Sequence, residues 1–219
     1  MFCGKLISPE ISPLGIRDTA AQASARMEEL KLRHLPLAEA GSYLGMVAED
    51  DLLDEPVDVE IGDLQDVFTH AFVRTGDIFL VAVKQCLEMQ TDIVPVLNEK
   101  KEYEGVITIE TLFRELARLS GAGDYGSLVV LEMEINEYSL GEINRLVESN
   151  DAVITQLNTL HDPESHLLTV VLRINKEEIS DVIATFQRHE YNVRYYVGEE
   201  LFRNELQSNL DHLLNYLNI

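Results

Sequence analysis

The first half of the chain contains an internal repeat, and this feature constrains the fold more than any other. Asp18-Thr-Ala-Ala-Gln-Ala23 precedes a helical stretch and Arg33-His-Leu-Pro-Leu37, and the same order returns in Asp77-Ile-Phe-Leu-Val-Ala82 and Asp92-Ile-Val-Pro-Val96. The aspartates at 18 and 77 and the prolines at 36 and 95 are each 59 residues apart. One such repeat is too small to cover its own sheet, so we expect the two to fold against each other.

Each repeat continues through a charged turn into a strand opened by glycine. Tyr43-Leu-Gly-Met-Val-Ala48 corresponds to Tyr103-Glu-Gly-Val-Ile-Thr108, and the extra residue falls in the turn Asn98–Glu102. The pattern predicts a helix, a short strand broken after its proline, a glycine-opened strand and a second helix in each repeat. The two halves should face each other around one sheet-lined crevice.

This pattern resembles a pair of CBS (cystathionine beta-synthase) domains, a Bateman module. The resemblance covers about residues 1–124, with repeats at about 1–60 and 66–122, and rests on Leu35-Pro36-Leu37 and Val94-Pro95-Val96, each followed by Gly-apolar-apolar and a helix. In that family, adenine nucleotides bind between the two repeats. The resemblance therefore implies a regulatory or sensor module with AMP, ADP or ATP as its ligand.

The resemblance also implies particular ligand contacts. A hydroxyl at the end of the glycine strand approaches phosphate, and an aspartate three residues later accepts hydrogen bonds from the ribose. The first repeat keeps the aspartate and the second keeps the hydroxyl, while the base would lie beside each proline. The predicted ligand-binding residues are therefore His34, Leu35, Asp51, Ile93, Val94 and Thr108. Asp51 and Thr108 have a simpler explanation, because both residue types stabilise helix N-termini without any ligand.

Two further segments look like ligand sites and are better explained structurally. Glu49–Asp66 holds nine acidic residues and no basic one, but their spacing does not match a calcium loop, which favours a solvated acidic connection. Gly121-Ala-Gly-Asp-Tyr-Gly126 matches G-x-G-x-x-G but follows a predicted helix and precedes a strand, the reverse of the dinucleotide-binding order. This second segment is interpreted as a domain boundary.

From Ser127 onward the pattern predicts a βαββαβ domain over about residues 127–198. Its expected elements are a strand at Leu128–Ile135, a helix capped by Ser139, strands at Asp151–Leu160 and Leu167–Ile174, a helix at Lys176–His189 and a strand at Tyr191–Val197. The whole chain is therefore predicted to be α+β, with tandem CBS repeats followed by a ferredoxin-like domain.

The second domain resembles an ACT domain, a family that binds amino acids or other small effectors and often forms dimers. Leu140-Gly-Glu-Ile143-Asn-Arg-Leu146-Val147 is similar to its first helix. Tyr138 stands where effector-binding members commonly place glycine, which favours a structural or dimerising role. His161 and His166 flank a turn without a third metal ligand in sequence reach, so no metal site is expected.

Residues 199–219 place Leu206, Leu210, Leu213, Leu214 and Leu217 at helical spacing. A C-terminal helix with this stripe must pack on another surface, and we expect a homodimer contact, with docking on the same chain as the alternative.

Composition and the absence of catalytic motifs narrow the function further. A net charge of −22 disfavours nucleic acid and anionic membranes as partners. Two cysteines outside any C-x-x-C pattern suit a reducing cytoplasm. Gly-x-Ser-x-Gly, H-E-x-x-H and Walker patterns are all missing, which points away from an enzyme. The sequence thus predicts a non-catalytic regulatory homodimer acting on an unknown protein, and the alternative is a ligand-free dimerising scaffold.

Overall fold

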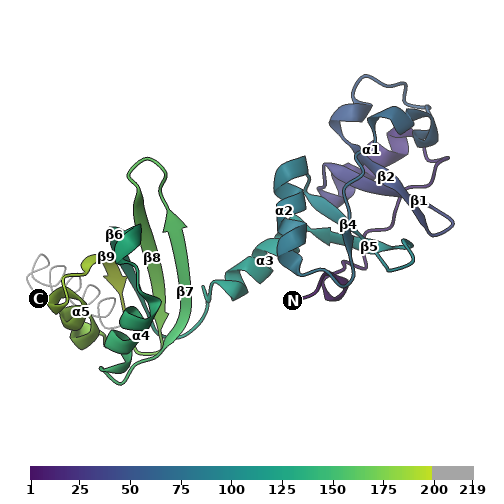
Figure 1. The fold of residues 1–219 in the computed structure, drawn as a ribbon. Helices are drawn as coiled ribbons and strands as arrows, with labels where there is room; N and C mark the ends of the chain where they lie inside the picture. The colour runs from purple at the N-terminus through teal and green to yellow at the C-terminus, as the bar shows by residue number, and fades with distance from the viewer. Residues whose placement is uncertain (199–219) are drawn as a thin grey trace, which may run out of the picture. The chain divides into compact units, whose positions relative to one another are not determined.

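The computed structural model describes residues 1–198 and divides into two compact units (Figure 1). The N-terminal unit is Met1–Leu116, and the C-terminal unit begins at Ala117. The predicted domain limits at 124, 127 and 198 remain predictions, and the predicted C-terminal helix at 199–219 lies outside the described residues. Within the part described, no helix is long and apolar enough to cross a lipid bilayer.

Each repeat of the N-terminal unit contains an α-helix followed by an antiparallel hairpin, and the second repeat adds a further helix. The first repeat contains α1 (Ala20–Leu30), β1 (His34–Glu39) and β2 (Ser42–Ala48). The second contains β3 (Val73–Arg74), α2 (Phe79–Met89), β4 (Ile93–Leu97), β5 (Tyr103–Thr108) and α3 (Ile109–Leu119). Three short 3-10 helices complete the unit: η1 (Cys3–Lys5), η2 (Asp50–Leu52) and η3 (Ile61–Val67).

The duplication extends to single hydrogen bonds. Oδ2 of Asp18 accepts from the backbone N–H of Gly15 at 2.9 Å, and Oδ2 of Asp77 accepts from that of Arg74 at 2.8 Å. Both α1 and α2 end on a residue in the left-handed region, Lys31 at φ 56° and Gln90 at φ 53°. The repeat in the sequence is therefore a repeat of backbone conformation.

The two hairpins share one register. Pro36 lies opposite Met46, and Pro95 lies opposite Val106. In both hairpins the register shifts directly after the residue that follows the proline, which is Leu37 in one and Val96 in the other. The strands continue through their prolines, which corrects the predicted break.

Strands from the two repeats form two small sheets rather than one. Their strand orders are β1-β2 and β3-β4-β5. The repeats are joined instead by isolated bridges. The N–H of Ser8 donates to the carbonyl of Val106 at 2.8 Å, and Thr69 and Met46 exchange two backbone bonds at 2.8 and 2.9 Å. The segment that precedes each repeat thus pairs with the glycine strand of the other repeat.

The hydrophobic cores follow this exchange. One cluster combines Met27, Leu35 and Met46 of the first repeat with Ile93 and Val106 of the second. The other places Cys3 and Leu6, from the start of the chain, among buried residues of the second repeat. The rings of Tyr43 and Tyr103, which are equivalent in the two repeats, stack with centroids 6.4 Å apart and an interplanar angle of 13°. This arrangement relates the halves by an approximate twofold axis.

The two repeats differ after their glycine strands. β5 leads into the eleven-residue helix α3, whereas β2 leads only into the three-residue η2. The second helix expected in the first repeat, at Glu49–Leu53, is therefore only the short 3-10 helix η2. The following residues carry closely spaced carboxylates and Pro56, and like charges together with a proline destabilise a continuing helix.

The C-terminal unit has the predicted βαββαβ order. Its elements are β6 (Ser127–Glu134), η4 (Ile135–Glu137), α4 (Leu140–Glu148), β7 (Ile154–His161), β8 (Leu167–Ile174), α5 (Ser180–Arg188) and β9 (Asn192–Val197). The antiparallel strand order β7-β8-β6-β9 is that of a ferredoxin-like fold. α5 begins four residues later than predicted, and Ser139 caps α4 as expected by accepting from the N–H of Glu142 at 3.3 Å.

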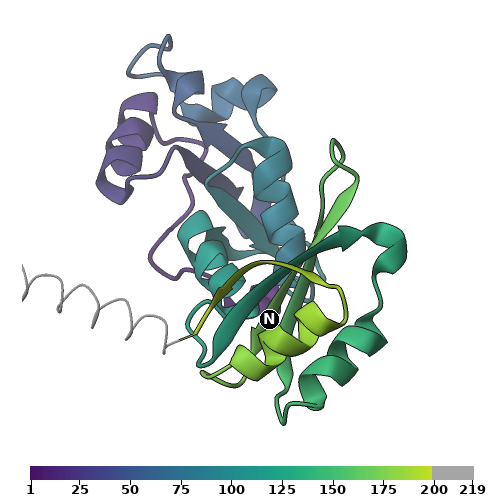
Figure 2. The ribbon, with the colours of Figure 1, turned by 90° about the vertical axis from the view of Figure 1, so that its left-hand side faces the viewer.

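Both helices of this unit cover the same face of the sheet (Figure 2). Alternate residues of β6 and β8 point toward them, including Val129, Leu131, Val170 and Leu172, all fully buried. The alternate buried residues of the strands and the apolar faces of α4 and α5 therefore pack into one core.

Gly45→Ala tests the exchange between the repeats. Gly45 has φ +148°, and a Cβ atom there would lie 2.8 Å from the Cβ of Phe68, in the segment that pairs with β2. We expect a loss of roughly 1–3 kcal/mol in unfolding free energy from the strained backbone and the clash. Gly76→Ala is the control, because a Cβ at Gly76 meets nothing within 4 Å. Equal urea midpoints for the two variants would contradict this account.

Candidate functional site

The candidate site is a cleft of about 440 Å³ in the N-terminal unit, at the junction of the two repeats. It is formed by the segment after Ile7, the end of α1, the start of β4 and the start of α3. The lining residues are Ser8, Glu10, Ile11, Leu30, Lys31, Leu32, Asp92, Thr108, Ile109, Glu110, Thr111 and Arg114. Its volume lies within the range of small-molecule sites, and its polar groups come from both repeats.

Thr108 holds the start of α3 at the cleft. Its Oγ1 accepts from the N–H of Thr111 at 3.2 Å and lies 3.1 Å from the Thr111 hydroxyl. The N–H of Ile109 donates to the carbonyl of Asp92 at 2.8 Å, which ties α3 to the start of β4. The helix cap predicted for Thr108 is therefore present, and two hydroxyls lie side by side in the cleft.

Asp92 connects the cleft with the first repeat. Its Oδ1 lies 2.7 Å from Nδ1 of His34, and its Oδ2 accepts from the backbone N–H of Arg33 at 2.5 Å. Burial opposes ionisation of this carboxyl, but the hydrogen bonds from His34 and Arg33 outweigh it and hold its pKa below the usual value. Asp92 is thus a fixed anion in the wall of the cleft.

The predicted ligand-binding residues do not all lie in the cleft. Thr108 lines the cleft, and Ile93 and Val94 follow Asp92 directly along β4. Leu35, Ile93 and Val94 have no exposed side-chain surface, and His34 is 8% exposed. The apolar residues beside the prolines therefore belong to the core. The assignment of these residues as ligand contacts stays a prediction.

Asp51 has a local structural partner. Its Oδ2 accepts from the backbone N–H of Ala48 at 3.0 Å, at the end of β2. It is not among the residues that line the cleft beside Thr108. The structure therefore does not bring the aspartate of the first repeat and the hydroxyl of the second into one cavity.

Sequence reasoning missed the basic residues of the cleft. Lys31 is the left-handed residue that ends α1, and Arg114 lies one turn into α3, where its Nη2 contacts Oε1 of Glu110 at 2.9 Å. Ser8 reaches the cleft through the bridge to Val106. Only the position of Arg114, three residues after Thr111 on a predicted helix, carries a signal in the sequence, since it shares a helical face with Thr111.

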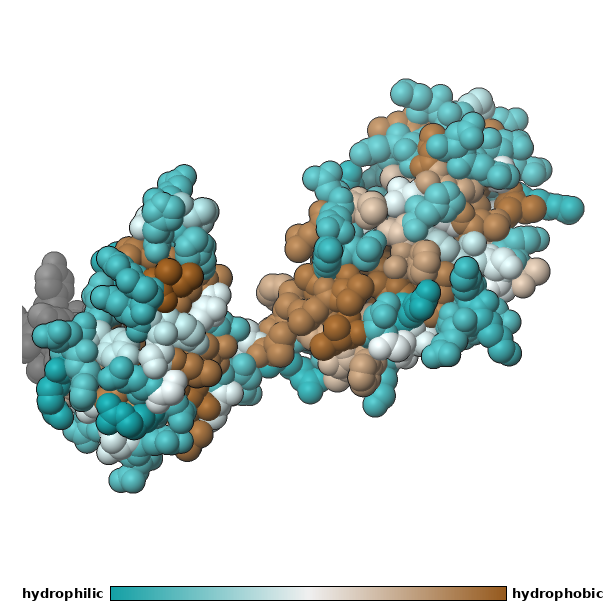
Figure 3. Space-filling model, in the orientation of Figure 1, coloured by the Kyte–Doolittle hydropathy of each residue, from teal (hydrophilic) through white to brown (hydrophobic). Residues whose placement is uncertain are grey.

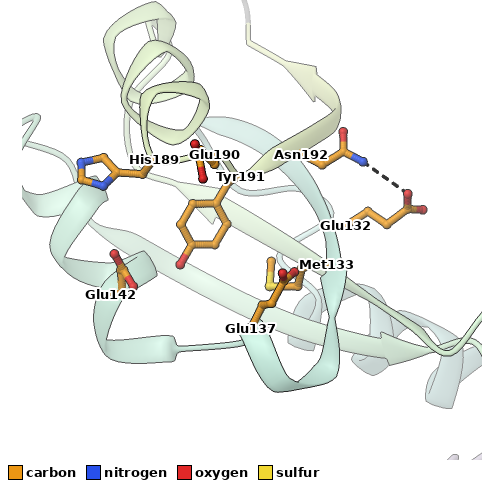
Figure 4. Close-up of a pocket in the computed structure, with 8 residues that line it drawn as sticks. All are labelled: Glu132, Met133, Glu137, Glu142, His189, Glu190, Tyr191 and Asn192. Atoms are coloured by element: carbon orange, nitrogen blue, oxygen red, sulfur yellow. Dashed lines mark hydrogen bonds between the residues drawn. The ribbon is translucent and has the colours of Figure 1, made fainter.

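A second cavity, of about 280 Å³, lies in the C-terminal unit between the end of β6, α4 and the turn before β9 (Figure 4). It is lined by Glu132, Met133, Glu137, Glu142, His189, Glu190, Tyr191 and Asn192. Nδ2 of Asn192 donates to Oε1 of Glu132 at 3.4 Å. Burial, together with the charge of Glu142, raises the pKa of the Tyr191 hydroxyl. Four carboxylates around one hollow oppose an anionic effector.

Other candidate ligand positions show structural roles. His161 ends β7 and His166 has φ 60° in the following turn, and residues 1–198 contain no group of three side chains suited to hold a metal ion. The glycine-rich segment after α3 leads into β6, as the boundary interpretation requires. Its Gly121 has φ +64° and a Cβ there would lie 3.1 Å from Arg173, so the glycine is needed for a turn against β8.

Comparison with known families finds a match in the first repeat. Residues 4–58 match the model of the CBS domain family. The matched segment contains α1, β1 and β2 together with the leading segment that pairs with the other repeat.

Comparison with solved structures extends this to the fold of the pair. A CBS domain pair/ACT domain protein from Thermotoga maritima matches with a TM-score of 0.50 and 21% identity, over 54% of this chain and 98% of that chain. The structure of CBSX2 in complex with AMP matches with a TM-score of 0.47 and 19% identity, over 54% and 97%. The CBS domains of a transcriptional regulator from Streptococcus pneumoniae match with a TM-score of 0.46 and 18% identity, over 52% and 98%.

Asp92→Asn tests the buried polar contact behind the cleft. We expect a loss of about 1–3 kcal/mol at neutral pH, because the charge-assisted bonds to His34 and Arg33 are weakened. The pKa of Asp92 is lowered by folding, so its contribution is present above about pH 4 and disappears as the pH falls through the lowered value. Urea unfolding of parent and variant from pH 7 to pH 2.5 measures the gap, which should close at the acid end.

The control for this variant is Asp50→Asn, which removes an ion pair to Arg33 whose side chains are 65% and 69% exposed. It should cost less than about 1 kcal/mol at any pH. A gap for Asp92→Asn that does not depend on pH would contradict the assigned ionisation.

Proposed function

Because the chain contains a CBS domain and its N-terminal unit has the fold of a CBS pair, we propose that it is a non-catalytic regulatory module. In this proposal an adenine nucleotide or related effector binds in the cleft between the repeats, and the change is transmitted through a homodimer to a regulated protein. The cytoplasm is its proposed location, in keeping with the free thiols of Cys3 and Cys86.

The composition of the cleft carries this proposal. Hydroxyls of Ser8, Thr108 and Thr111 and the cations of Lys31 and Arg114 converge on one cavity with apolar walls from Ile11 and Leu32. Hydroxyls and cations suit the ribose and phosphate of a nucleotide, and apolar surface suits a base. The resemblance to CBS pairs, which bind adenine nucleotides between their repeats, supports the same class of ligand.

The outer surface of α2 and α3 supports the homodimer. Several apolar side chains are exposed there: Leu80, Val81, Leu87, Met89, Ile109 and Phe113, with Leu87 at 75% and Phe113 at 72%. Figure 3 shows a continuous hydrophobic area over this part of the N-terminal unit. An apolar area of this kind commonly marks a protein interface, so we propose that two copies associate through it.

A thermal-shift series tests the effector. AMP, ADP and ATP are added to the full chain at rising concentrations, with S-adenosylmethionine and amino acids as comparison ligands. Binding to the native state should raise the melting temperature of the N-terminal unit by roughly 5–10 °C at a hundredfold excess over Kd. If no adenine compound shifts the melting temperature, the nucleotide proposal is wrong and the ligand-free scaffold gains support.

Sedimentation equilibrium of the full chain tests the dimer. The double variant Leu87→Glu/Phe113→Glu should weaken dimerisation at least about tenfold, since two charges would be buried in an apolar interface. The control is Leu53→Glu, because Leu53 is 72% exposed but lies after η2, away from α2 and α3. A monomeric parent, or a double variant that associates as well as the parent, would contradict the proposed interface.

A further inference from the structure

The internal repeat gives the Thr108 cleft an equivalent position in the first repeat, at Ala48, where the other glycine strand ends. Thr108 faces Ile93 in the second hairpin, and Ala48 faces His34 at the same position of the first. Glu49 donates its N–H to the carbonyl of Arg33 at 2.8 Å, as Ile109 does to Asp92. The backbone around the two positions is therefore alike, and differences in ligand binding must come from side chains.

The side chains that line the Thr108 cleft differ in charge and polarity from those at the equivalent positions of the first repeat. Thr108, Thr111 and Arg114 on one side correspond to Ala48, Asp51 and Asp54 on the other. The Thr108 cleft therefore presents hydroxyls and a cation where the equivalent positions present a methyl group and two carboxylates. Glu49 and Asp50 lie between Ala48 and Asp51, so Ala48 is followed directly by acidic residues that repel phosphate.

The polar groups beside Ala48 also have partners within the protein. Asp51 accepts from the N–H of Ala48 at 3.0 Å, so this carboxylate is already held at the strand end. Arg33 occupies the position equivalent to Asp92. Its Nη2 contacts Oδ2 of Asp50 at 3.1 Å, so this cation is already paired. The three-residue η2 stands in place of the longer α3. A ligand there would have to displace these contacts.

Charge in the Thr108 cleft further limits its ligand. Lys31 and Arg114 face three carboxylates, those of Glu10, Asp92 and Glu110, and Arg114 is paired with Glu110 at 2.9 Å. The formal charge of the lining is thus slightly negative within a chain of net charge −22. One phosphate can be matched by Lys31, whereas each additional phosphate meets uncompensated carboxylates.

We propose that the Thr108 cleft, and not the equivalent position beside Ala48, binds an effector, with one molecule per chain, and that the cleft prefers a nucleoside monophosphate to the triphosphate. This inference rests on the proposed function and specifies its site and ligand. Thr111 and Thr108 bind the sugar-phosphate part, and Lys31 neutralises the single phosphate. The expected affinity for AMP exceeds that for ATP at least about tenfold.

Isothermal titration of the full chain with AMP and with ATP, without Mg²⁺, tests the proposal. The expected stoichiometry is about one AMP per chain. Thr111→Val should weaken AMP binding at least about tenfold, because a hydroxyl is replaced by a methyl group of similar size. The matched control is Asp51→Asn at the equivalent position of the first repeat, which keeps an acceptor for the N–H of Ala48 and should leave AMP binding unchanged.

A second matched pair tests the charge argument. Glu110→Gln should raise the affinity for ATP at least about threefold relative to AMP, because it removes one carboxylate from the cleft. Asp50→Asn, at the equivalent position, should leave the ATP-to-AMP ratio unchanged. Circular dichroism melting confirms that each variant is folded before titration.

The outcomes separate this inference from the proposed function. Two AMP molecules per chain, loss of binding in Asp51→Asn but not in Thr111→Val, or tighter binding of ATP than of AMP would each overturn the inference and leave nucleotide sensing intact. Absence of binding by any adenine nucleotide to the folded parent overturns the nucleotide proposal itself, and the inference with it.

Discussion

The exchange of leading segments between the two repeats is the constraint on which the N-terminal unit depends. β5 receives Ser8 from the start of the chain, and β2 receives Thr69 from the connection between the repeats. Close approach is possible because Gly45 and Gly105 have φ values of +148° and +142° and no side chain. Neither glycine strand is completed by its own repeat, so the halves must fold together. The cleft follows from this exchange, since the same bridge that brings Ser8 to Val106 places it two residues from Thr108.

Local sequence patterns predicted most of the helices and strands, but they did not predict how the two repeats are joined. The 59-residue spacing gave α1, α2 and both hairpins, because each rests on contacts within about thirty residues. The bridges of Ser8 and Thr69 join segments that are distant in the sequence and carry no periodicity of their own. A longer helix was expected after Ala48 because the second repeat has one at the equivalent position. The clustered carboxylates and Pro56 argued locally against it, and only the three-residue η2 forms. In the C-terminal unit, where turns are short, even β8 agreed with its predicted limits.

The candidate site was harder to predict than the fold. Apolar-Pro-apolar segments identified the repeat because they are core strands, and for the same reason their side chains are buried. Thr108 was predicted as a ligand contact from the family resemblance, and the structure shows its simpler alternative role, that of a helix cap. Lys31 and Ser8 reach the cleft only through the tertiary arrangement of α1 and the leading segment. Asp92, identified in the sequence only as the start of a strand, connects the cleft to His34 through a contact across 58 residues.

The contrast between the Thr108 cleft and the equivalent position beside Ala48 follows from the unequal demands on backbone and side chains. Both repeats must keep the glycine, the register shift and the bridge, since the exchange fails if either half loses them. Side chains after the glycine strands carry no such requirement, because α3 and η2 both satisfy the backbone there. Acidic residues after Ala48 are therefore as compatible with the fold as the hydroxyls and the cation after Thr108. A duplicated domain of this kind can keep its symmetry in the core and lose it at the surface, and the surface decides which ligand is bound.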